Sequence, residues 1–369
     1  MAIHVRRGVA AVVIVFSTTL LTTASSGSFR ASAAPPFAAS TQLGMNTFVP
    51  YNCESSSLWS QLASTQFQAF KGLGANAVAL AFPLYTDSLT SNAFYAKDVC
   101  GTQYQSPPPA ELATLVDIAH AMGLQVFVRP FLYETNLRAE KPGAWRGIID
   151  PTNTDLWFRH YWTTMLPYLQ MAQANRVEHF AISTELQSMA AKPNWRALIA
   201  KARHVYTGDL VFTTNSAPGG NNNDEVHWSG TRVGLDFYSG VPRLSSTATP
   251  AQIVAGWNRE LATTNPFPLI SSATISETSI LPQDGAYSQP YTWSLPLAKH
   301  PFNQSIQANW FTAVCRFFTS HKMGGVYFWG SVIYEQGGAL LRGPSMSAST
   351  ISEIQPLAQQ AIRVCFTGR

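Results

Sequence analysis

Two glutamates stand out among the 20 acidic residues because each closes an apolar, strand-like segment. Glu185 follows the segment His179–Thr184, and Glu277 follows the segment Leu269–Ser276. Burying an unpaired charge costs on the order of several kcal/mol, so each carboxylate needs a partner or a catalytic task. Two carboxylates about 5–5.5 Å apart suit hydrolysis of a glycosidic bond with retention, in which one is the nucleophile and the other the acid/base.

For either glutamate alone, a structural hydrogen bond at the rim of a fold is an equal alternative. The pair is more informative, because strands four and seven of a barrel end at one axial cleft. An acid/base also needs a raised pKa. We expect the charge of Glu277 to raise the pKa of Glu185.

Further aromatic and polar side chains lie near strand ends and are candidates for binding a sugar. Aromatic rings stack on the apolar faces of sugar rings, and a tyrosine hydroxyl can hold a carboxylate ionised. On this basis we predict substrate contacts for Tyr238, Trp228 and Trp329, with a core position as the alternative for each. Arg129 and Asn215 are candidate partners for sugar hydroxyls or carboxylates, and for Arg129 a structural salt bridge is the alternative.

Eight short segments, mostly continuous apolar runs, have the pattern of parallel strands buried on both faces. We predict strands at Gly44–Phe48, Ala77–Phe82, Val126–Phe131, His179–Thr184, Leu210–Thr214, Val233–Tyr238, Leu269–Ser276 and Gly325–Trp329. Helical patterns are predicted at 57–72, 108–122, 155–174, 195–206, 250–263, 304–321 and 349–365, and the connection 215–230 lacks one. This alternation predicts an α/β fold, a single (β/α)8 TIM barrel, with a doubly wound sheet as the alternative.

No cofactor or metal site is expected from the motifs. The stretch Gly72–Ala77 matches G-x-G-x-x-A, but it follows a helix and precedes a strand, the reverse of the order in a dinucleotide-binding fold. The glycines are better explained as a helix end and turn. The eight histidines are scattered singly.

Residues 1–33 have the pattern of a cleavable secretion signal. Arg6 and Arg7 precede an apolar stretch that begins at Gly8, and Ala31–Ala33 is an A-x-A cleavage site. An uncleaved anchor is the alternative. We therefore predict a signal peptide at 1–33 and one catalytic domain at 34–369, which is secreted and not bound to a membrane after cleavage.

The positive charge of the chain comes mostly from this leader. The chain has 24 basic and 20 acidic residues, and the leader carries three of the arginines and no acid. The remainder therefore has 21 basic and 20 acidic residues, a net charge of +1. No basic run is left to neutralise a phosphate backbone, so we expect no nucleic-acid partner. The expected partner is an uncharged polysaccharide or oligosaccharide, bound by a monomer.

Export makes disulfides the expected state of the four cysteines. Cys53 and Cys100 lie in loops after consecutive predicted strands, and Cys315 and Cys365 lie in the last two predicted helices. We predict the pairs 53–100 and 315–365. A four-cysteine metal site would need closer paired spacing.

The layout resembles the clan A glycoside hydrolases, and more narrowly the bacterial β-mannanases of glycoside hydrolase family 113. The resemblance extends from about Gly44 to Trp329, and it rests on the order of several short motifs. These are Trp145–Gly147, Phe180–Leu186, Val205–Leu210, Thr214–Asn215, Val226–Trp228, Val233–Tyr238 and Ile275–Glu277.

The resemblance implies a role for each main candidate. Glu185 would be the acid/base and Glu277 the nucleophile, Tyr238 would hydrogen-bond the nucleophile, and Trp329 would form the sugar platform. Three segments depart from the family pattern, namely Ser183 for Gly, Arg129–Phe131 for Lys-Pro-His, and Ser239–Val241 for Phe-Pro-Leu.

The expected activity is therefore that of a secreted retaining β-glycosidase acting on β-mannan. Two alternatives stay open. One is glucan or galactan specificity, and the other is a carbohydrate-binding barrel that has lost turnover.

Overall fold

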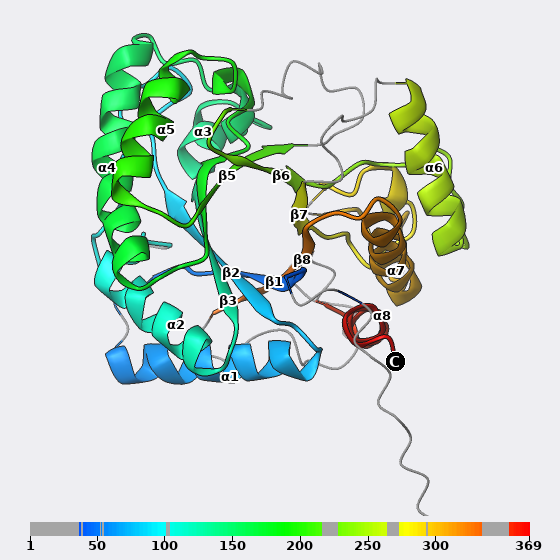
Figure 1. Ribbon diagram of the computed structural model, residues 1–369. Helices are drawn as coiled ribbons and strands as arrows, with labels where there is room; N and C mark the ends of the chain where they lie inside the picture. Colours follow the sequence, from blue (N-terminus) through cyan, green and yellow to red (C-terminus); the bar gives the residue numbers. More distant parts are fainter. Residues whose placement is uncertain are drawn as a thin grey trace, which may run out of the picture. The chain divides into compact units, whose positions relative to one another are not determined.

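Eight parallel strands close into a barrel in which each strand pairs with its neighbours in chain order (Figure 1). The last strand, β8 (Gly325–Val332), pairs with the first, β1 (Gln42–Phe48). The computed structural model describes residues 37, 40–51, 53, 55–100, 104–215, 228–263, 273–292, 294–333 and 354–369, which belong to one compact unit. The predicted (β/α)8 barrel is confirmed, and closure of the sheet excludes the doubly wound alternative.

The elements form where the sequence pattern predicts them, with shifts at their ends, except for α3, a short helix that the pattern did not predict. The other strands are β2 (Ala77–Leu84), β3 (Gln125–Leu132), β4 (His179–Thr184), β5 (Asp209–Asn215), β6 (Arg232–Asp236) and β7 (Thr274–Thr278). The helices are α1 (Ser56–Gly72), α2 (Pro109–Ala121), α3 (Thr135–Glu140), α4 (Thr154–Ala174), α5 (Asn194–Val205), α6 (Pro250–Thr263), α7 (Gln304–Ser320) and α8 (Pro356–Thr367). Short 3₁₀ turns lie at η1 (Arg146–Ile148), η2 (Gln187–Met189) and η5 (Ala286–Ser288).

Some sequence predictions fall on residues that the structure does not describe. These are the signal peptide at 1–33, most of the connection 215–230, the start of the predicted seventh strand at 269–272 and the start of the last helix at 349–353. Among the described residues, no helix has both the length and the apolar character needed to cross a membrane.

The centre of the barrel is filled by a small core, separate from the larger one between strands and helices. Its members are Ala77, Ala79, Phe127, Ala181, Val211 and Tyr327. The alanines leave room for the rings of Phe127 and Tyr327, whose centroids lie 5.5 Å apart. Gly44 on β1 makes room for the same tyrosine, because a Cβ on Gly44 would lie 2.1 Å from a Tyr327 ring carbon.

Register shifts interrupt several strand pairings near the carboxyl ends of the strands. One lies between Ala181 and Ser183 on β4, and others lie in the β6–β7 and β7–β8 pairings. A bulge inserts a residue into one strand and re-aims the side chains beyond it. The β6–β7 shift brings Asp236 opposite Glu277.

The predicted ends of three strands are wrong, because register shifts make the strand pairing irregular there. β7 continues to Thr278, so Glu277 lies within the strand and not after it. β6 ends at Asp236, which leaves Tyr238 two residues beyond the strand. β8 continues past Trp329, because its end pairs again with β1 after a register shift.

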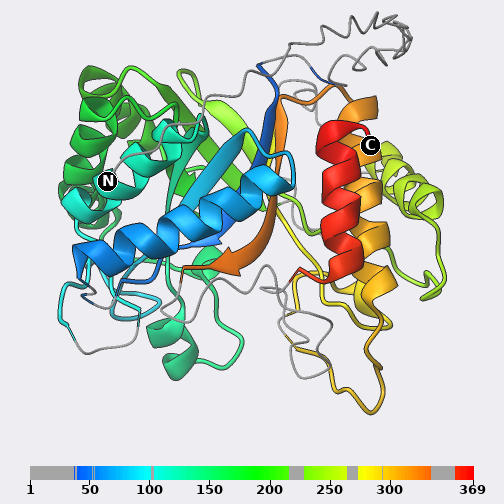
Figure 2. The same ribbon diagram turned by 90° about the horizontal axis from the view of Figure 1, so that it is seen from below.

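Two disulfides join neighbouring parts of the barrel wall, as the sequence predicted. Cys53 pairs with Cys100, which links the loops after β1 and β2. Cys315 on α7 pairs with Cys365 on α8, and Figure 2 shows these two helices side by side. Among the described residues there is no free cysteine.

We predict that Gly44→Ala destabilises the barrel, because the added methyl group forces the buried ring of Tyr327 out of place. Overpacking of this kind costs about 1–3 kcal/mol. Urea unfolding followed by tryptophan fluorescence should show this loss in the free energy of unfolding. Gly72→Ala is the matched control, because a Cβ there meets nothing within 4 Å. Equal stability of the two variants would contradict the prediction.

Candidate active site

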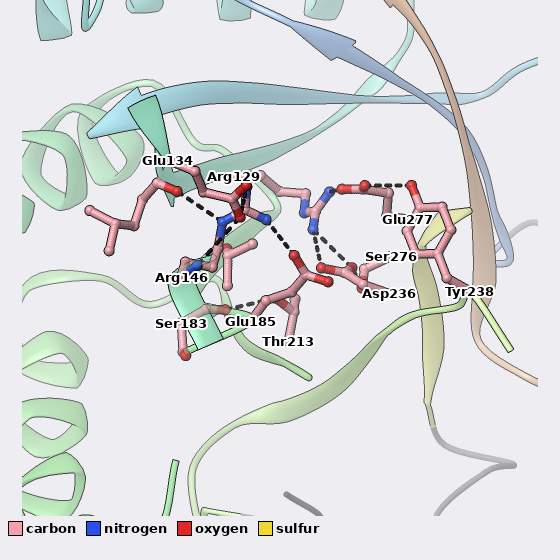
Figure 3. Close-up of polar contacts among 12 residues, drawn as sticks. Arg129, Glu134, Arg146, Ser183, Glu185, Thr213, Asp236, Tyr238, Ser276 and Glu277 are labelled. Atoms are coloured by element: carbon pink, nitrogen blue, oxygen red, sulfur yellow. Dashed lines mark hydrogen bonds and ion pairs between the residues drawn. The ribbon is translucent and has the colours of Figure 1, made fainter. Parts of the chain in front are cut away.

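Glu185 lies directly after β4 in a left-handed backbone conformation. Its φ of +53° is one that non-glycine residues rarely adopt, at a cost of about 1–3 kcal/mol. The amide of Glu185 donates a hydrogen bond to the carbonyl of Thr213 on β5 (3.2 Å), which holds the turn. The turn ends the strand and leaves the side chain buried among polar groups (Figure 3). These groups lie at the end of the barrel formed by the carboxyl ends of the strands, which we call the barrel mouth.

The pKa of Glu185 is raised to about 8, so this side chain carries a proton at neutral pH. Burial is the largest cause. Arg146 acts in the opposite direction, and the charges of Asp236, Glu277 and Glu134 raise the pKa further. The sequence predicted that Glu277 would be the source of the shift. Glu277 contributes, but removal of the carboxyl group from water is the larger effect.

Both carboxylate oxygens of Glu277 accept a hydrogen bond. The Tyr238 hydroxyl donates to Oε1 (2.6 Å), and Nη1 of Arg129 donates to Oε2 (2.7 Å). Burial, followed by the charge of Glu277, raises the pKa of Tyr238 well above its usual value, so its hydroxyl remains a donor. The Glu277 side chain is 18% exposed, compared with 9% for Glu185 and 0% for Asp236, which makes Glu277 the most accessible of these three carboxylates.

Arg129 connects Glu277 to a second carboxylate, Asp236, at the end of β6. Nη2 of Arg129 lies 2.8 Å from both Asp236 oxygens, and Ser276 donates to Oδ1 of Asp236 (2.7 Å). Burial lowers the pKa of Arg129, but the charges of Asp236 and Glu277 outweigh it and raise the pKa. Burial raises the pKa of Asp236 to about 6 against the effect of Arg129, so Asp236 is ionised at neutral pH.

Arg146 connects Glu185 to a further carboxylate, as Arg129 connects Glu277 to Asp236. Arg146, the first residue of η1, forms ion pairs with Glu185 and, through Nη2 (3.2 Å), with Glu134 after β3. Glu134 also pairs with Arg138 of α3. Two guanidinium groups thus bridge four carboxylates across the mouth (Figure 3).

Asn215 and Trp329, which the sequence predicted as substrate contacts, also lie at the barrel mouth. Asn215 ends β5 opposite Asp236, and Trp329 lies opposite Asn46, which accepts a hydrogen bond from Arg129. Among the described residues, neither Oδ1 of Asn215 nor Nε1 of Trp329 has a hydrogen-bond partner.

Trp228 and Arg129 are already engaged by the protein. The half-buried Trp228 donates from Nε1 to the carbonyl of Ala190 after η2 (3.1 Å). Arg129 is 1% exposed and bonds to carboxylates, which is the salt-bridge alternative stated from the sequence. Its contact with a sugar hydroxyl stays a prediction.

Sequence reasoning did not place Arg146, Glu134 or Asp236 in the site. Glu134 and Asp236 are visible from the sequence as acids at strand ends, and Arg146 lies in one of the motifs that carried the family resemblance. Asp236 could not be paired with Arg129 from the sequence, since β3 and β6 come together only in the closed barrel. Glu134 and Arg146 are only 12 residues apart, but nothing in the sequence shows that this segment folds back onto Glu185.

The arrangement can transfer a proton and attack an electrophile. Three arginines (129, 138 and 146) face four carboxylates (134, 185, 236 and 277), so the charges balance when one carboxylate holds a proton. Glu185, with its pKa of about 8, is that group, and Glu277 is the accessible carboxylate. No group of three or more His, Cys, Asp or Glu side chains suited to a metal occurs in the described part of the chain.

Comparison with known proteins gives a family and a fold. The model of glycoside hydrolase family 113 matches residues 47–336. A GH113 β-1,4-mannanase in complex has a TM-score of 0.67 at 17% identity, covering 89% of this chain and 99% of that one. The GH113 β-mannanase AaManA from Alicyclobacillus acidocaldarius has a TM-score of 0.64 at 19% identity, covering 89% and 97%. No curated protein matches the chain in sequence.

We predict that Arg129→Met strongly destabilises the fold, because it leaves the buried Asp236 carboxylate without its counter-ion. Breaking a buried pair costs about 3–5 kcal/mol. Arg138→Met is the matched control, since Arg138 is 50% exposed and its pair with Glu134 is worth at most about 1 kcal/mol.

Chemical denaturation of both variants at neutral pH tests this difference. The double variant Arg129→Met/Asp236→Leu should regain part of the loss, because it removes the isolated charge. Equal unfolding free energies for Arg129→Met and Arg138→Met would show that the buried pair does not support the barrel mouth.

Proposed function

Because this chain belongs to glycoside hydrolase family 113, we propose that it is a retaining β-glycosidase with Glu277 as nucleophile and Glu185 as acid/base. One observation carries this assignment. The two glutamates share one mouth, but Glu185 is buried and protonated, whereas Glu277 is partly exposed and bonded through both oxygens. Two carboxyl groups in such different environments suit opposite roles.

The reaction proceeds in two steps. Glu277 attacks the anomeric carbon while Glu185 gives its proton to the leaving oxygen, which forms a covalent glycosyl-enzyme intermediate. Glu185, now a carboxylate, takes a proton from water, and the resulting hydroxide displaces Glu277 from the sugar. Tyr238 and Arg129 hold the Glu277 carboxylate in place between the steps.

The proposed substrate is β-1,4-mannan. Two solved structures similar in fold are described as β-1,4-mannanases, and the mature chain of net charge +1 suits an uncharged polymer. Trp329 and Asn215 are the proposed contacts for the sugar beside Glu277. Trp228, on the side of Glu185, would line the cleft farther along.

We predict that the wild-type protein releases reducing sugar from mannan faster than from glucan, xylan or galactan. Glu277→Ala should lose activity by at least about 10³-fold, because no covalent intermediate can form. Glu185→Ala should lose about 10²–10⁴-fold on mannan, where the leaving group needs a proton.

An aryl β-mannoside with a good leaving group separates the two roles. With this substrate Glu185→Ala should form the intermediate rapidly, and azide should then release a β-glycosyl azide, while Glu277→Ala should not form the intermediate. Unchanged activity in Glu277→Ala would overturn the nucleophile assignment. Binding of mannan without any release would indicate a carbohydrate-binding barrel.

We also propose that the chain is exported and loses residues 1–33. The leader pattern of Arg6, Arg7 and the Ala31–Ala33 site supports this proposal. The two disulfides agree with it, because disulfides persist in oxidising compartments.

Expression of the full chain in a secreting bacterial host should yield mature protein in the medium that begins at Ala34. Intact mass and N-terminal sequencing measure this start directly. A variant with Arg6→Glu and Arg7→Glu should remain inside the cell, because it lacks the positive n-region. Membrane-bound protein that still carries residues 1–33 would favour the uncleaved anchor.

A further inference from the structure

The guanidinium of Arg146 is shared between the proposed acid/base and a carboxylate that the mechanism above does not use. Nη1 of Arg146 contacts Glu185, and Nη2 lies 3.2 Å from Oε1 of Glu134. A guanidinium carries a single positive charge. Arg146 therefore neutralises either carboxylate only in part when both are ionised.

Arg146 is fixed in this bridging position. Its Nε donates to the carbonyl of Leu132 (2.8 Å), and its guanidinium lies 4.9 Å from the ring centroid of Phe131. The side chain is 16% exposed. Arg146 cannot leave Glu185 for the solvent without losing these contacts.

Glu134 is held just as firmly. It precedes α3, and its side chain is 11% exposed. Arg138 pairs with Oε2, while the backbone amide of Arg146 donates to Oε1 (3.4 Å). These contacts hold the Glu134 carboxylate against Nη2 of Arg146, while Glu185 contacts Nη1 of the same guanidinium.

The charged and titratable groups around Glu185 come from three strands and from the segments after β3 and β6. They are Arg129 on β3, Glu134 before α3, Arg146 on η1, Asp236 on β6, Glu277 on β7 and Tyr238 after β6. With Arg138 included, the set is neutral when Glu185 is protonated. If Glu134 lost its charge, the same set would become neutral with Glu185 ionised.

We propose that Glu134 is a positioning residue which, by engaging Arg146, keeps the proton on Glu185 that the glycosidase reaction consumes. This inference rests on the proposed function of Glu185 as the acid. The Glu134–Arg146 pair leaves Arg146 too weak a partner to ionise Glu185 before substrate arrives. When the proton moves to the leaving oxygen, the same arginine contacts the new carboxylate, and the proton returns from the attacking water.

The test is the pH profile of kcat/KM for Glu134→Gln, which keeps the shape of the side chain and removes its charge. Wild-type activity should fall as pH rises through about 8, where Glu185 loses its proton. In Glu134→Gln we expect this basic limb to move to lower pH by about one unit or more, the size of an effect from an uncompensated neighbouring charge.

Two further variants separate this role from a general charge or folding effect. Glu140→Gln removes a negative charge from α3, the helix that follows Glu134, but Glu140 accepts from the backbone amide of Leu89 (2.8 Å) and should leave the limb in place. Glu134→Asp keeps the charge and should return the limb most of the way to the wild-type position. Thermal unfolding of each variant confirms that the folded protein is being measured.

A second readout does not depend on activity. The carboxyl carbon of Glu185, assigned by ¹³C NMR through comparison with Glu185→Gln, should titrate at lower pH in Glu134→Gln than in wild type. An unmoved titration and an unmoved basic limb in folded Glu134→Gln would overturn the inference. Absence of wild-type hydrolysis on every polysaccharide would instead count against the proposed function, and the NMR titration would still decide the role of Glu134.

Discussion

The barrel mouth depends on balancing charge in a space that excludes water. Buried carboxylates are costly unless cations and hydrogen-bond donors compensate them. Arg129 and Arg146 supply that compensation, and both lie nearly out of solvent. Each of these arginines pairs with two carboxylates, so the carboxylates outnumber the cations. One proton neutralises the remaining negative charge. The position of that proton, on Glu185, creates the difference between the two catalytic candidates.

The backbone of the strands positions the residues of this charge network. Register shifts in β4, β6 and β7 occur close to the residues that enter it, and Glu185 adopts a left-handed conformation that a glutamate does not favour. Strain and bulges cluster at functional sites, where surrounding structure compensates their cost. Here the compensation comes from the rest of the barrel, including its filled centre around Tyr327 and its two disulfides.

Much of this architecture was predictable from local pattern. Continuous apolar runs alternating with helical periodicity gave eight strands, and the bounds of β4 were predicted to the residue. Both disulfides followed from the loops and helices that carry the cysteines. The ends of β6, β7 and β8 were less predictable, because a bulge depends on the neighbouring strand and leaves little trace in the sequence. Glu277 was found by its type and neighbourhood, although its strand boundary was wrong.

The sequence by itself determined the barrel and the pairing of cysteines, and it singled out two glutamates near the ends of β4 and β7, since each depends on periodicity or on order along the chain. Only the tertiary structure decided which arginine meets which acid. Arg129 and Asp236 are 107 residues apart in sequence and lie 2.8 Å apart across the barrel. The same holds for the raised pKa of Glu185. Burial is its main cause, and burial is a property of the assembled mouth that no residue type or spacing expresses.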